Sequence, residues 1–154
     1  MEQRSRDQYT LAWGYAVELI AVAFLWILIE LRVGFIETAK FLYLKKADIF
    51  VFVAIAAGVC GVFFAAFIAA MCVEFGKELR KAGAANEYFV ALTIPFLALG
   101  AAFAALYLVE SAAPAFSAEL ALFFLIYATI NCITMVRNVY GLYKLWQDLE
   151  QLNT

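Results

Sequence analysis

Hydrophobic residues are gathered into four long runs along this chain, and most charged residues lie between the runs or at the two ends. The runs cover roughly residues 11–31, 49–73, 88–109 and 117–139. Each is about as long as a helix that crosses the ~30 Å hydrocarbon layer of a bilayer. Because a helix satisfies its own backbone hydrogen bonds inside lipid, the pattern predicts an all-α membrane protein. We expect a four-transmembrane-helix bundle that forms a single integral membrane domain over residues 1–154.

Two shorter segments have an amphipathic pattern. Residues 36–48 mix apolar and charged positions, which suits either a short interfacial helix or a continuation of the first span. Past Arg137, apolar residues recur every three or four positions and predict a C-terminal amphipathic helical extension of the fourth span. This stripe either folds onto the membrane surface or the chain's own loops, or docks a partner through Leu142, Trp146 and Leu149.

Composition supports the membrane assignment. Hydrophobic residues make up 67% of the chain, charged residues make up 16%, and the mean hydropathy is +0.88. Apolar residues are about half of an ordinary soluble domain. The net charge of −2 and the scattered basic residues give no basic face, which argues against nucleic acid as a partner. The expected partners are the lipid bilayer and either further copies of the chain or other membrane subunits.

The distribution of Lys and Arg predicts the orientation. Seven lie at the two ends and in the second loop, and four lie in the first loop. The positive-inside rule therefore places both termini in the cytoplasm. We expect the bacterial inner membrane, with an organelle membrane as the alternative. The first run is too long for a signal peptide and has no small-x-small cleavage pattern after it, so we expect it to be a retained span.

The chain carries none of the common catalytic patterns. It has no histidine, which removes the usual haem ligand and general base. We find no nucleophile beside a base, no glycine-rich phosphate loop and no metal-ligand cluster, and we expect a protein that is not an enzyme and needs no cofactor or metal. Cys60, Cys72 and Cys132 are isolated within apolar segments, and we interpret them as small packing residues.

Small residues are regularly spaced in the second span. Ala57, Gly61, Ala65 and Ala69 fall at four-residue intervals and predict close helix packing, either within the chain or between two copies. The third span offers a matching row, Ala91, Ala98, Ala102 and Ala105.

One acidic residue, Glu18, lies well inside a predicted span, where a charge costs about 2.5–3.5 kcal/mol on insertion scales. One face of the fourth span and a position of similar depth in the third offer polar partners: Thr93, Tyr127, Asn131, Thr134 and Asn138. Together they predict an intramembrane polar site, which is either a hydrogen-bond network that fixes helix register or a proton or cation site. Near the outer face, Glu30, Glu110 and Glu119 serve either as solvated span ends or as a cation-attracting vestibule.

Two functions fit these patterns. The first is a non-catalytic accessory or assembly subunit of a membrane complex, which acts through helix packing. The alternative is a homo-oligomeric ion channel or small proton- or cation-coupled transporter that uses Glu18 and the polar stripe of the fourth span.

Overall fold

The computed structural model describes residues 2–81, 83–109 and 115–152, with side chains for residues 15–81, 83–109 and 116–148. Within these residues the chain consists of helices joined by short connections. The helices are α1 (Glu2–Val33), α2 (Phe35–Ala70), α3 (Glu74–Lys81), α4 (Ala85–Tyr107) and α5 (Ala115–Leu152).

Three of these helices are long and apolar enough to cross a membrane, namely α2, α4 and residues Phe116–Asp148 of α5. The all-α prediction is confirmed, and three of the four predicted spans fall in these helices. The remaining run, residues 11–31, lies in α1, which is not among the three when its described side chains, residues 15–33, are considered. The described side chains of α1 include three charged ones, Glu18, Glu30 and Arg32.

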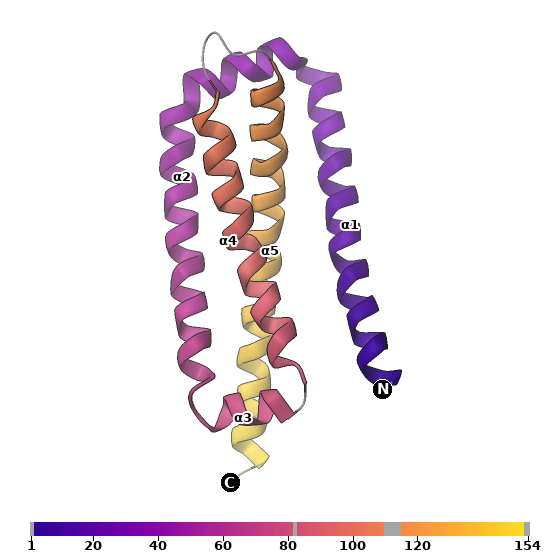
Figure 1. Ribbon diagram of the computed structural model, residues 1–154. Coiled ribbons are helices and arrows are strands. Elements are labelled where there is room, and N and C mark those ends of the chain that lie inside the picture. The colour runs from indigo at the N-terminus through magenta and orange to yellow at the C-terminus, as the bar shows by residue number, and fades with distance from the viewer. Residues whose placement is uncertain (1, 82, 110–114, 153–154) are drawn as a thin grey trace.

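The long helices stand side by side, and each pair among α2, α4 and α5 is in contact (Figure 1). The contact between α4 and α5 is the most extensive in the fold, and α1 packs mainly along α5 with a smaller contact to α2. The helix α1 begins at the end of the bundle where α5 ends (Figure 1). The helix α1 therefore depends on α5 for most of its packing.

Alanines line the contact between α4 and α5. Ala98 and Ala102 of α4 are buried in one cluster with Ala128 of α5, and Ala105 is buried in a second cluster with Ala121. Small side chains let two helix backbones approach closely, which is the main source of helix association in lipid. The small-residue row that the sequence shows in the third span thus faces the interior of the bundle.

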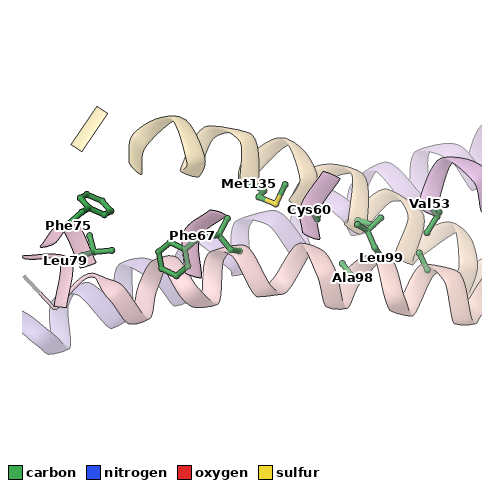
Figure 2. Close-up of a cluster of buried hydrophobic side chains, with 11 residues drawn as sticks. Val53, Cys60, Phe67, Phe75, Leu79, Ala98, Leu99 and Met135 are labelled. Carbon is green, nitrogen blue, oxygen red and sulfur yellow. The ribbon is translucent and has the colours of Figure 1, made fainter. Parts of the chain in front are cut away.

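The small-residue row of α2 lies differently. Ala57 packs against the main buried cluster and Gly61 lies beside the ring of Phe96, whereas Ala65 and Ala69 are exposed. The buried positions in this second part of α2 are larger and fall at seven-residue intervals: Val53, Cys60 and Phe67. Figure 2 shows these three beside residues of α4 and α5. The larger side chains fill the space between α2 and its neighbours, and this turns the end of the small row outward.

Residues 36–48 belong to α2. Gly34, with a φ of 84°, breaks the helix after α1, because only glycine adopts this conformation without strain. The first part of α2 then runs across the end of the bundle before the helix turns down beside α4 (Figure 1). On its inner face, Leu42 is buried against Leu106 and Ala118. The expected interfacial helix is therefore continuous with the second span and not with the first.

Lys46 fastens this crossing segment to the end of α4. Its Nζ donates hydrogen bonds to the carbonyl oxygens of Tyr107 at 2.9 Å and Val109 at 2.8 Å. The last carbonyls of a helix lack partners inside the helix and carry partial negative charge, so an ammonium group there both satisfies and stabilises them. Lys46 thus joins α2 to the C-terminal end of α4.

The second loop contains a short helix, α3, with Phe75 and Leu79 buried. Gly83 has a φ of 76° and closes α3 with paired backbone bonds from Gly83 N to Arg80 O at 3.0 Å and from Ala84 N to Leu79 O at 3.1 Å. This is a Schellman arrangement, which requires the left-handed conformation that glycine supplies. The helix break that glycine suggests in this loop is therefore located at Gly83.

The C-terminal stripe of α5 meets α3. The ring of Trp146 stacks on Phe75 with centroids 5.4 Å apart and planes 17° apart, and Leu142 packs against the main buried cluster. Of the three residues predicted to dock a partner, Trp146 therefore contacts the chain's own loop helix, and Leu142 packs against the main buried cluster. The side chain of Leu149 lies outside the described residues.

Candidate intramembrane polar site

A regular row of side chains on α1 faces a matching row on α5. Residues four apart lie on one face of a helix, and the two helices run antiparallel. We call this contact the α1–α5 seam. Its residues are Glu18, Val22, Trp26 and Glu30 on α1 and Glu119, Phe123, Tyr127 and Thr134 on α5.

Glu18 and Thr134 form the polar end of the seam nearest the start of α1. The hydroxyl of Thr134 donates to Oε1 of Glu18 at 2.8 Å. The other carboxylate oxygen, Oε2, is buried and has no hydrogen-bond partner among the described residues. The phenols of Tyr15 and Tyr127 lie within electrostatic range of this carboxylate. Glu18 thus has one satisfied and one unsatisfied oxygen in a partly aromatic setting.

Two further carboxyl groups form the opposite end of the seam. The indole Nε1 of Trp26 donates to Oε2 of Glu119 at 2.8 Å. Glu30 lies close enough to Glu119 for the two to interact electrostatically. Oε1 of Glu119 and both oxygens of Glu30 are buried without hydrogen-bond partners among the described residues. The oxygens of Glu30 and Glu119 are covered by protein, which differs from the expected solvation at the span ends. Glu110 lies outside the described residues.

The middle of the seam is apolar. Val22 is 0% exposed, and the rings of Trp26 and Phe123 meet edge to face with centroids 6.3 Å apart. This packing separates Glu18 from the Glu30 and Glu119 pair. The seam therefore holds polar groups at its two ends and a dry contact between them.

The structure brings only part of the predicted polar site together. Thr134 contacts Glu18, and Tyr127 lies near it. Asn131 is buried, but its amide donates to the carbonyl of Tyr127 on its own helix at 2.9 Å. Asn138 is half-buried further along α5, and no hydrogen bond places it on Glu18.

Thr93 lies away from Glu18. Its hydroxyl donates to the carbonyl of Phe89 one turn earlier in α4, at 2.8 Å. The helix α4 packs against α2 and α5, whereas α1 packs mainly along α5 (Figure 1). A similar depth in the membrane does not place two residues on neighbouring helices, and the grouping of Thr93 with Glu18 is not seen.

Sequence reasoning missed Tyr15 and Trp26 as members of the seam. The signal for Trp26 is present, because Glu18, Val22, Trp26 and Glu30 are spaced four apart. Trp26 lies near the end of an apolar run, where tryptophan is common as an interfacial anchor. The indole hydrogen bond to Glu119 shows a more specific contact.

These features define an all-helical membrane protein with ionisable groups between two of its helices. Among the described residues, no group of three or more His, Cys, Asp and Glu is placed to hold a metal ion. Comparison with models of protein families, with curated proteins and with solved structures finds no match for the chain.

Proposed function

We propose that the chain is a four-span membrane protein that carries protons along the α1–α5 seam. The observation that supports this proposal is the carboxyl group of Glu18, which receives one hydrogen bond from Thr134 and has a buried second oxygen without a partner. A buried polar atom without a hydrogen-bond partner costs free energy, so its presence calls for an explanation. Ionisable side chains within the membrane are functional candidates for this reason.

The ligand set favours a proton over a metal cation. Hard cations such as Ca²⁺ take six to eight oxygen ligands, and Mg²⁺ demands about six in octahedral geometry. Among the described side chains, the oxygens near Glu18 come from one hydroxyl and two phenols. A proton needs a single acceptor, which the free oxygen of Glu18 supplies.

In this proposal α1 is the fourth span. Its 32 residues would extend about 48 Å at 1.5 Å per residue, more than the hydrocarbon layer requires. Its contacts with α5 run from Thr134 to Glu119, within the segment of α5 that is long and apolar enough to span. An even number of crossings brings both termini to one face, which the positive-inside count assigns to the cytoplasm.

Accessibility of epitope tags tests the four crossings. We expect tags at the two termini to be reached from the same side of sealed vesicles. A tag inserted between residues 110 and 114 is expected to be reached from the other side. Termini on opposite sides would show that α1 does not cross and would remove the seam from the membrane interior.

The apolar middle of the seam sets the condition for conduction. Val22 and the contact of Trp26 with Phe123 leave no chain of polar groups from Glu18 to the Glu119 end. Proton movement therefore requires α1 to shift relative to α5, or a second copy that completes the path. Either condition is compatible with the packing of α1, which lies mainly against α5.

Proton flux into vesicles tests the activity. The purified chain is reconstituted with a pH-sensitive dye inside the vesicles, and an inward proton gradient is imposed together with a potassium ionophore to balance charge. We expect faster acidification than in vesicles without protein. Equal rates in the two preparations would contradict the proposal.

A second candidate function is that of an accessory or assembly subunit, and the outward face of α2 favours it. Ala54, Gly58, Ala65 and Ala69 are exposed on one side of this helix. Gly58 has open space around its Cα, so another helix could approach the backbone there. Small residues at such spacing are typical of helix–helix contacts in membranes.

Disulfide trapping in native membranes tests this second function. In a Cys72→Ser background, Ala65→Cys is expected to give a cross-linked species if the small-residue face is an interface between copies. Val59→Cys, also exposed but about 120° away around α2, serves as the matched control. Equal cross-linking at both positions would indicate random collision and would contradict a specific contact.

A further inference from the structure

Two cysteines that are distant in the sequence meet inside the bundle. The Sγ atoms of Cys60 on α2 and Cys132 on α5 are 3.9 Å apart. Cys60 is 1% exposed, and Cys132 is half-buried. From the sequence these residues are expected only to pack, because each is isolated within an apolar segment. The fold makes them a pair, and the third cysteine, Cys72, is exposed and apart from them.

A third sulfur lies in the same cluster. Met135 is three residues beyond Cys132 on α5, so the two side chains are neighbours on the helix surface. Met135 is 1% exposed and belongs to the buried cluster that contains Cys60. Figure 2 shows the side chain of Met135 beside Cys60 in the space between α2 and α5. The other buried members of the cluster are hydrophobic.

The separation of the two thiols suits a shared metal ion. A metal–thiolate bond is about 2.3 Å long, and two such bonds across 3.9 Å enclose an angle of about 116°. This angle is close to the 120° of trigonal coordination. A disulfide would need the sulfur atoms about 1.9 Å closer together. The thiols thus lie at the distance of two ligands of one ion, with the Met135 thioether available as the third.

We propose that Cys60, Cys132 and Met135 form a binding site for Cu(I). Thiolate and thioether sulfur are soft ligands that select Cu(I). A structural zinc site almost always has four protein ligands drawn from cysteine, histidine and carboxylates, whereas the described residues offer no group of three His, Cys, Asp and Glu.

The protons are accounted for as the ion binds. Both cysteines ligate as thiolates, so two S–H bonds break, two Cu–S bonds form and two protons leave to solvent. The Met135 thioether binds through a sulfur lone pair. The complex carries one net negative charge. No electron is transferred in this step.

Competitive titration tests the site. The full-length chain is purified in detergent with a reductant, under argon, and titrated with Cu(I) in the presence of the chromogenic chelator bathocuproine disulfonate. We expect one Cu(I) per chain to be withdrawn from the chelator. X-ray absorption of the loaded protein is expected to show sulfur neighbours only. Both measurements are independent of proton flux and of any partner.

Three variants test which sulfur atoms bind the ion. Cys60→Ser and Cys132→Ser are each expected to lose binding, and Met135→Leu is expected to weaken it. Cys72→Ser is the matched control and is expected to bind as the original chain does. Circular dichroism and elution volume establish that each variant is folded. If Cys60→Ser fails to fold, alkylation of the half-buried Cys132 in the unaltered chain replaces it and is expected to block binding.

The outcomes separate clearly. Loss of binding in both serine variants with retention in the Cys72 variant supports the site. Binding that survives either Cys60→Ser or Cys132→Ser, binding that is lost equally in Cys72→Ser, or nitrogen and oxygen neighbours in the absorption spectrum would overturn it. So would a failure of the unaltered, reduced chain to withdraw Cu(I) from the chelator.

Discussion

Vesicles that carry the Glu18→Gln variant are expected to acidify no faster than empty vesicles. Glutamine has nearly the same size and retains an oxygen that accepts the hydrogen bond of Thr134, so the α1–α5 contact is preserved. The amide of glutamine does not gain or lose a proton near neutral pH. Removing a positioned proton-transfer group typically costs about 10²–10⁴-fold in rate, which would reduce the flux to background.

Two matched variants make this result specific. Glu37→Gln changes a carboxylate that is 63% exposed and paired with Lys40, and it is expected to leave flux unchanged. Thr134→Val keeps the acid but removes its donor, and it is expected to give intermediate flux. The assay measures dye quenching at equal amounts of inserted protein. Unchanged flux in Glu18→Gln would show that Glu18 does not carry the proton.

Replacing Lys46 with methionine is expected to destabilise the bundle by about 1.5–3 kcal/mol, the range for losing hydrogen bonds to a charged group. The change removes both bonds to the carbonyls of Tyr107 and Val109 while keeping a long apolar side chain. It leaves the last carbonyls of α4 without their cation at a helix end that carries partial negative charge. Equilibrium unfolding in mixed detergent measures the difference.

The control for this variant is Lys40→Met. Lys40 lies on the same segment of α2, is 61% exposed and pairs with the exposed Glu37. An exposed ion pair of this kind contributes about 0–1 kcal/mol. Equal destabilisation in the two variants would show that loss of a surface charge, and not of the contact with α4, causes the effect.

The sequence predicts local structure here better than lateral arrangement. Apolar run length identifies the helices, and the alanine row of the third span identifies the face of α4 that packs on α5. The row of α2 is a weaker guide, because Val53, Cys60 and Phe67 occupy the interface and Ala65 and Ala69 are exposed. Small residues permit close packing in lipid but do not require it.

The polar site shows the same limit. A four-residue period marks the face of α5 that carries Tyr127 and Thr134, and Glu18 is identifiable as an acid inside a run. The order of helices around the bundle is not encoded in any single run. Depth in the membrane alone therefore could not show that Thr93 and Glu18 lie apart. The meeting of Cys60 with Cys132 depends on the same order.

The attachment of α1 has a consequence for assembly. This helix is joined to the remainder of the chain by Gly34, a residue free to adopt several backbone conformations, and most of its packing is with α5. If the joint opened, α1 of one molecule could lie along α5 of another and form the same set of contacts. Exchange of α1 between neighbouring molecules would give a domain-swapped pair. Glu18 and Glu30 of one polypeptide would then face α5 of the other, which carries Glu119.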